Sequence, residues 1–153
     1  MTFGTSTELG LTSVKGKKLS VATNGNLVGQ DLRVSHPAVN ATITVGAEST
    51  NVRTITIQFT DAYGEDVAEV VPFELHVFSS AAGTAYATGG STGIAAGTDG
   101  AALAVVAKLI FACTSESDGD WDGTWTDTGT ESVAVAVKLP NGCMVITDAF
   151  ANT

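Results

Sequence analysis

The stretch VAVAVKLPNGCMVITDA (133–149) decides the fold class. Valine alternates with alanine over residues 133–137, which is the period of two that a half-buried β-strand requires. The letters PNG at 140–142 supply a turn, and a second apolar run follows it. Two apolar runs around an Asn-Gly turn are a strong signal for a β-hairpin. The stretch therefore predicts two antiparallel strands.

The same alternation recurs upstream. Apolar and polar residues alternate over 39–45, and residues 54–60 place Ile55, Ile57 and Phe59 on one face. Every second residue from 71 to 77 is apolar and is predicted to point inward. Counting from residue 39 gives about seven strands, with turns every 8–12 residues. This spacing is typical of an all-β, immunoglobulin-like antiparallel β-sandwich.

Several positions within this pattern need separate predictions. Residues 79–100 are rich in Gly, Ser and Ala and predict a surface excursion with one short strand near 84–87. Ala101–Cys113 is apolar on both faces, which predicts one strand buried on both faces or, alternatively, a short helix. We expect Trp125 in the core, Trp121 at a loop surface, and His76 pointing outward into solvent.

The charge is unevenly distributed along the 153 residues, whose net charge is −9. Residues 1–38 carry four basic and two acidic residues, whereas residues 39–153 carry three basic and fourteen acidic ones. We therefore divide the chain into an extended N-terminal arm (1–38) and a β-sandwich domain (39–153). The alternative is that residues 1–38 form the first strand pair of the same domain. An acidic body argues against nucleic acid and anionic membranes as partners.

The arm is the predicted contact with a partner, through its basic residues Lys15, Lys17, Lys18 and Arg33. The first ten residues lack the charged and apolar regions of a signal peptide, and the longest apolar run, 13 residues, is too short to span a membrane. We therefore expect the chain to remain in the cytoplasm during its synthesis, with Cys113 and Cys143 as reduced, buried thiols.

One motif resembles the beginning of a calcium loop. Asp118, Asp120 and Asp122 stand at alternate positions before Gly123, but the bidentate acid of such a loop would fall at Gly129, which has no side chain. An exposed acidic turn without metal is therefore favoured, with these three aspartates as the weaker metal candidate. No nucleophile–base or acid–base set is recognisable, so we expect no catalytic residues, no cofactor and no enzymatic activity.

Four segments in order resemble a family of small tailed-phage virion structural proteins: TVGAESTNVRTITIQFTDAYGEDVAE (44–69), GIAAGTDGAAL (93–103), SESDGDWD (115–122) and VKLPNG (137–142). The resemblance covers residues 39–150. It implies a head decoration or cement protein, located on the virion, that binds the major capsid protein or another virion protein as a homo-oligomer. The alternatives are a tail or fibre component, or a carbohydrate- or calcium-binding module that uses residues 116–122 and Trp121.

Overall fold

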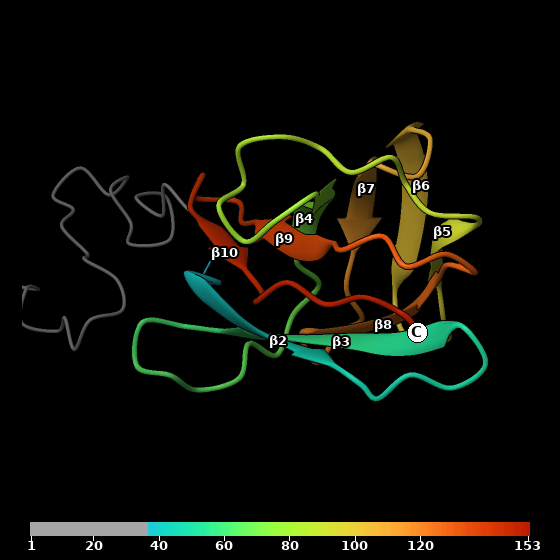
Figure 1. The fold of residues 1–153 in the computed structure, drawn as a ribbon. Coiled ribbons are helices and arrows are strands. Elements are labelled where there is room, and N and C mark those ends of the chain that lie inside the picture. The colour runs from blue at the N-terminus through green and yellow to red at the C-terminus, as the bar shows by residue number, and fades with distance from the viewer. Residues whose placement is uncertain (1–36) are drawn as a thin grey trace, which may run out of the picture. The chain divides into compact units, whose positions relative to one another are not determined.

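Nine β-strands in two antiparallel sheets make up the part of the chain that the computed structural model describes, residues 37–153 (Figure 1). The arm's Lys15, Lys17, Lys18 and Arg33 lie outside the described residues. The strands are β2 (Asn40–Val45), β3 (Val52–Thr60), β4 (Pro72–Phe78), β5 (Gly93–Ala96), β6 (Ala101–Val106), β7 (Ile110–Thr114), β8 (Asp120–Thr126), β9 (Ala134–Lys138) and β10 (Met144–Ile146).

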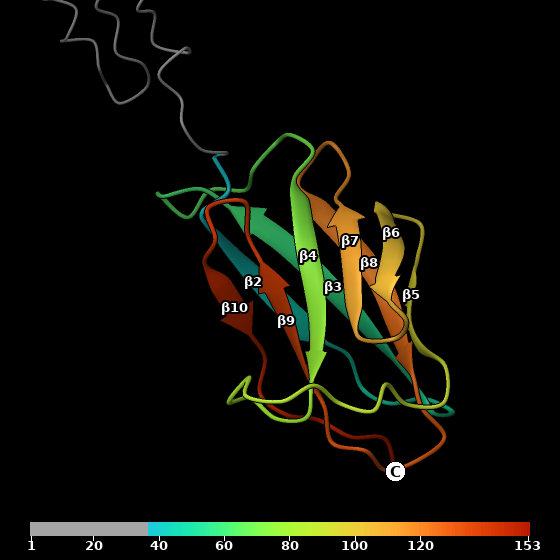
Figure 2. The same ribbon diagram turned by 90° about the horizontal axis from the view of Figure 1, so that it is seen from above.

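The order of the strands follows the immunoglobulin pattern. One sheet runs β2-β3-β8-β5, which corresponds to A-B-E-D, and the other runs β10-β9-β4, which corresponds to G-F-C. The hairpin of β7 and β6 extends the second sheet beyond β4, as the extra hairpin of variable-type domains does. Here β5 precedes that hairpin in the chain. The five-stranded sheet lies over the four-stranded one (Figure 2), which confirms the predicted sandwich.

The core forms where the inward positions of the two sheets meet. Ile55, Ile57 and Phe59 of β3 are buried, as their alternation predicts. Phe73 of β4 joins the two layers, because its ring centroid lies 4.9 Å from that of Phe59 and 6.1 Å from that of Trp121 on β8, edge-on to the latter. Such tilted aromatic contacts add to the stabilisation that burial provides.

Trp121 is fully buried, so its predicted place at a loop surface is wrong. Strand β8 already begins at Asp120, which gives Trp121 an inward position that it shares with Trp125. Two glycines leave room for the ring: a Cβ at Gly100 or Gly123 would collide with it. The burial therefore depends on backbone positions that are close to the tryptophan only in the folded chain.

The segment 101–113 is a hairpin and not one buried strand. Leu109 N donates to the carbonyl of Val106 at 3.0 Å, and Lys108 between them has a φ of 68°. The Lys108 ammonium donates to the carbonyls of Gly90 and Ser91 at 3.0 and 2.8 Å, which holds this left-handed residue in place. Among residues 37–153, strand β6 pairs with β7 alone, at the sheet edge, and it is largely exposed.

The predicted hairpin at 133–149 is present as β9 and β10. Leu139 N donates to the Cys143 carbonyl at 2.9 Å, and Gly142 takes the left-handed conformation that the turn requires, with a φ of 90°. In the segment 79–100, no strand forms near 84–87, where one was predicted; Tyr86 makes only an isolated bridge with Phe78, while β5 was not predicted.

Candidate binding surface

The side of the five-stranded sheet that faces away from the second sheet carries a row of neighbouring side chains. Leu103, Ala112, Glu74, Lys138 and Met144 stand opposite one another in β6, β7, β4, β9 and β10. Alternation directs them outward, since the residues next to them in their strands point into the core. We call this surface the outer face; it also includes Pro72, Ala101 and Thr114.

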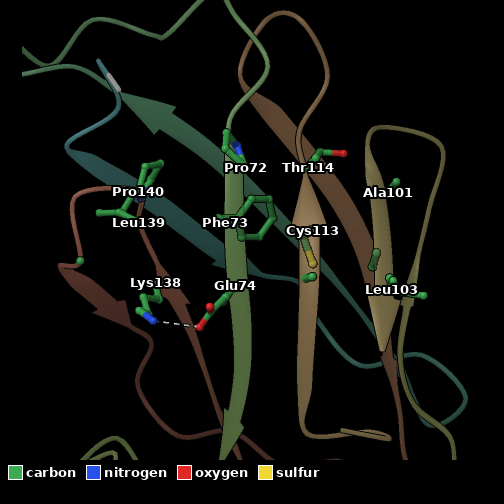
Figure 3. Close-up of a pocket in the computed structure, with 13 residues that line it drawn as sticks. Pro72, Phe73, Glu74, Ala101, Leu103, Cys113, Thr114, Lys138, Leu139 and Pro140 are labelled. Atoms are coloured by element: carbon green, nitrogen blue, oxygen red, sulfur yellow. Dashed lines mark hydrogen bonds and ion pairs between the residues drawn. The ribbon is translucent and has the colours of Figure 1, made fainter. Parts of the chain in front are cut away.

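A hollow of about 710 Å³ opens on the outer face (Figure 3). It forms because Ala112 has only a methyl group, whereas its neighbours on either side, Leu103 and Glu74, have long side chains. The lining is mostly apolar and comes from four strands and the β9–β10 turn: Pro72, Phe73, Glu74, Ala101, Ala102, Leu103, Ala112, Cys113, Thr114, Lys138, Leu139, Pro140 and Gly142.

Large apolar side chains are exposed around this hollow. Leu103 is 72% exposed and Met144 46%, at opposite edges of the sheet, and Val105 beside the β6 bulge is 63% exposed. Single exposed apolar residues are ordinary on protein surfaces, but Leu103 also borders a hollow with a mostly apolar lining, and an apolar surface of this kind suits a contact. The sequence contained the signal for this surface in the uncharged run 101–107, which we had expected to be buried.

The charged pair of the outer face is internally balanced. The Lys138 ammonium donates to Glu74 Oε2 at 3.1 Å. This hydrogen bond lowers the pKa of the Glu74 carboxyl, and a second one from His76 lowers it further. Both side chains remain more than 40% exposed, so the pair is solvated and contributes little to stability. The outer face therefore presents apolar area without net charge.

His76 is buried, contrary to the prediction of a solvated side chain. Its ring stacks against Phe78 and Tyr86, its Nδ1 lies 3.0 Å from the Tyr86 hydroxyl, and its Nε2 lies 3.2 Å from Glu74 Oε2. A hydroxyl, an imidazole and a carboxylate in this order resemble the arrangement of an activated nucleophile. Neither His76 nor Tyr86 lines the hollow, however. The contacts of His76 and Phe78 with Tyr86 hold the residues that follow β4 over the sheet.

The three aspartates of the calcium-like motif do not converge on one point. Asp122 Oδ1 accepts from the backbone N–H of Asp99 at 2.8 Å, which ties it to the β5–β6 turn. Burial and a hydrogen bond with Asp118 raise the pKa of Asp120. Across residues 37–153, no group of three or more His, Cys, Asp or Glu side chains is placed to hold a metal ion.

Two carboxylates that sequence reasoning missed organise the glycine-rich loop. Glu131 accepts from the N–H groups of Thr88 and Gly90 at 2.7 and 3.1 Å, and Asp127 accepts from that of Ser91 at 2.9 Å. Burial pushes the pKa of Glu131 upward, but these backbone hydrogen bonds outweigh it and the pKa lies below its usual value. These two carboxylates therefore hold the backbone of the glycine-rich loop in place.

The two cysteines are free thiols in different surroundings. Cys113 is buried beside the hollow, and this burial raises the pKa of its thiol to about 12. Cys143 lies exposed in the turn between β9 and β10. Sequence reasoning had expected both thiols to be buried, and only Cys113 is.

Comparisons with known proteins add little to this geometry. No family model matches the chain, and no curated protein does. Among solved structures, the chain is similar to the GAE domain of GGA2p from Saccharomyces cerevisiae, with 12% identity over 77% of this chain and 92% of that one. The TM-score of this match is 0.25, so we draw no conclusion from it. Residues 37–153 contain no helix with the length and apolar character needed to cross a membrane.

Proposed function

We propose that this chain is a non-enzymatic bacteriophage virion protein that decorates or cements the head by binding the lattice of the major capsid protein. The observation that supports this most is the outer face, an exposed apolar sheet surface without net charge. Such a surface suits a protein that acts by contact. The four segments that resemble phage virion proteins support the particular setting.

The use of the buried and partly buried polar side chains agrees with a role in binding alone. Asp127, Glu131, Asn152 and Arg53 all bond to backbone groups of loops, and His76 fastens Tyr86. Loops fixed in this way present a rigid surface, and rigidity lowers the entropic cost of each contact. Many copies on one lattice would then gain avidity from contacts that are individually weak.

The arm is the proposed attachment to the capsid. Its basic residues contrast with the body, where fourteen acidic residues face three basic ones. A basic segment that crosses an acidic neighbour reduces the repulsion between closely packed copies. Main-chain pairing of an extended segment with a sheet edge would contribute most of the affinity, because exposed ion pairs are worth only about 0–1 kcal/mol each.

The other roles predicted from the sequence have less support. A sugar site built on Trp121 would need its ring at the surface, and that ring is fully buried. A calcium site at Asp118, Asp120 and Asp122 would need convergent carboxylates. A tail or fibre position uses the same fold, and mass spectrometry of purified particles distinguishes it by the copy number relative to the major capsid protein.

Co-sedimentation with particles tests the proposed role. Because Ala38 is fully buried, the truncation should remove residues 1–36 and keep Pro37 and Ala38. We expect this variant to keep its β-type circular dichroism and to lose most particle binding. Replacing Lys15, Lys17 and Lys18 with Ser should weaken binding less than the truncation does. Full binding by the truncated protein would show that the arm is not the attachment.

A further inference from the structure

We infer that Asn141 is a site of spontaneous covalent modification, at which the side-chain amide is lost and the chain acquires aspartate or isoaspartate. The site lies in the turn between β9 and β10, where Gly142 follows Asn141. The turn supplies an accessible amide, a glycine nitrogen as nucleophile and a hydrogen-bond donor for the reacting oxygen. The reaction needs only water and concerns the free protein, so the inference stands apart from the virion role.

The reaction begins with an attack by the main chain on its own side chain. The backbone nitrogen of Gly142 loses its proton to hydroxide and bonds to Asn141 Cγ. The Cγ–Nδ2 bond then breaks, and the departing nitrogen takes a proton from water to leave as ammonia, which regenerates hydroxide. Because the two reacting atoms belong to neighbouring residues, this intramolecular attack is favoured over direct attack by water.

The product of the attack is a five-membered cyclic imide, which water opens. Water adds to one of the two imide carbonyl carbons, and the bond from that carbon to the Gly142 nitrogen breaks. Breakage at Cγ leaves aspartate at position 141. Breakage at the main-chain carbonyl carbon leaves isoaspartate, in which the chain continues through the former side chain. Both products carry a carboxylate where Asn141 had a neutral amide.

Glycine at position 142 favours the attack. A side chain there would crowd the tetrahedral intermediate, whereas Gly142 has no atom within 4 Å of the place where a Cβ would stand. Its φ of 90° is one that glycine adopts without strain. Asn141 is exposed, so hydroxide and water reach it. The other asparagines of residues 37–153 precede alanine, valine and threonine, respectively: Asn40, Asn51 and Asn152.

A backbone donor already engages the oxygen on which charge develops. Cys143 N donates to Asn141 Oδ1 at 2.8 Å, which closes an Asx turn and fixes the side-chain amide against the peptide units that follow it. When Gly142 N attacks, Cγ becomes tetrahedral and Oδ1 takes the negative charge. The Cys143 N–H then stabilises this intermediate in the way that the donors of an oxyanion hole do.

One hydrogen bond opposes the reaction. Gly142 N donates to the Leu139 carbonyl at 2.9 Å, and this bond must open before the nitrogen can lose its proton. The bond lies in an exposed hairpin turn, and such bonds open locally at a small fraction of the free energy of global unfolding. Asn152 is the contrasting case, because it is buried and its amide donates to the carbonyls of Asn51 and Asp127.

Conversion of Asn141 changes the charge beside the hollow. Pro140 and Gly142, on either side of Asn141, both line the hollow (Figure 3). Each conversion adds one negative charge to a surface on which Glu74 and Lys138 balance each other. Isoaspartate also lengthens the main chain by one carbon within the turn. A chain that has aged therefore presents a different outer face from a newly made one.

Peptide mapping of the full chain during incubation at mildly alkaline pH tests the inference. Trypsin cleaves after Lys138, so residues 139–153 form one peptide that contains both Asn141 and Asn152, and fragment ions separate the two. We expect Asn141 to lose its amide at a rate within about tenfold of the rate in urea, because the exposed turn opens readily, while Asn152 keeps its amide in the native chain. The Asn24–Gly25 pair falls in the peptide 19–33 and is counted separately.

Asn141→Gln is the matched control, since it keeps an exposed amide but would have to form a six-membered ring, and the acidic form of this peptide should disappear. A protease that cleaves before aspartate and not before isoaspartate distinguishes the two products. An Asn141 amide that persists in the native chain, or that is lost more than about tenfold more slowly than in urea, would overturn the inference. Aspartate without isoaspartate would also overturn it, because direct attack by water on the side chain gives aspartate alone. Circular dichroism before and after incubation establishes that the native samples stay folded.

Discussion

Arg53 and Asn152 lie 99 residues apart in the sequence and are hydrogen-bonded, with Arg53 Nε donating to Asn152 Oδ1 at 3.1 Å. The Arg53 guanidinium also donates to the Ala151 carbonyl at 2.7 Å. Asn152 is buried, and its amide donates to the carbonyls of Asn51 and Asp127 at 2.7 and 2.9 Å. The start of β3 is thereby joined to residues that follow the last strand.

Asn152→Ala should lower the free energy of unfolding by about 2–4 kcal/mol, because it removes three hydrogen bonds and leaves the buried Asp127 carbonyl without the Asn152 donor. Urea denaturation followed by tryptophan fluorescence measures the change. Asn40→Ala is the control, since Asn40 is exposed on β2 and should cost less than about 0.5 kcal/mol. Equal stabilities of the two variants would contradict this role for Asn152.

Gly123→Ala should destabilise the sandwich by about 1–3 kcal/mol through overpacking, because the added methyl would meet the Trp121 ring and the Ala95 carbonyl. Gly64→Ala is the control for the backbone alone. Gly64 has a φ of 86° and open space around it, so its cost of about 1–2 kcal/mol comes only from the left-handed conformation. Near-ultraviolet circular dichroism should change in Gly123→Ala and remain unchanged in Gly64→Ala.

Asp120→Asn should stabilise the protein at neutral pH. Burial is the main cause that raises the pKa of Asp120 above its usual 3.8, and the neighbouring Asp118 raises it further. Because the folded state disfavours the ionised carboxylate, the free energy of unfolding falls as the pH rises from 3.8 through the pKa of the folded state. Below pH 3.8 the aspartate is protonated in both states, and the advantage of asparagine should disappear. Thermal melts of the natural chain and of the variant at several pH values measure this difference in stability.

Calcium should leave the melting temperature unchanged when it is added in millimolar excess. Asp122 already accepts from Asp99 N, Asp118 and Asp120 share a hydrogen bond, and Gly129 offers no carboxylate. Differential scanning fluorimetry with and without a chelator provides the measurement. A rise in melting temperature that Asp120→Ala abolishes would establish a site at this turn.

Elements defined by local sequence could be predicted in advance. The β9–β10 hairpin depends on the Asn141–Gly142 turn and the apolar runs beside it, and all of that information lies within 17 residues. The inward positions of β3 follow from strict alternation in the same way. Residues 101–113 show the limit of such reasoning, because nothing in their composition marks Lys108 as left-handed.

The candidate site depended on tertiary neighbours and was missed for that reason. An apolar run such as 101–106 appears buried when only its own side chains are considered. Its exposure arises from the position of β6 at the sheet edge, and the hollow arises from the register that sets Ala112 between Leu103 and Glu74. Trp121 shows the opposite case, since Gly100 and Gly123 come together around it only on folding.

The difference in exposure between the two thiols allows a fluorescent dye to be attached at one position of the natural sequence. The thiolate is the form that reacts with maleimides, and burial keeps Cys113 protonated with a pKa of about 12. A fluorophore would therefore attach to Cys143 without any engineered substitution. Cys143 adjoins Gly142, which lines the hollow, so the brightness and anisotropy of such a dye would change whenever another molecule covers the outer face.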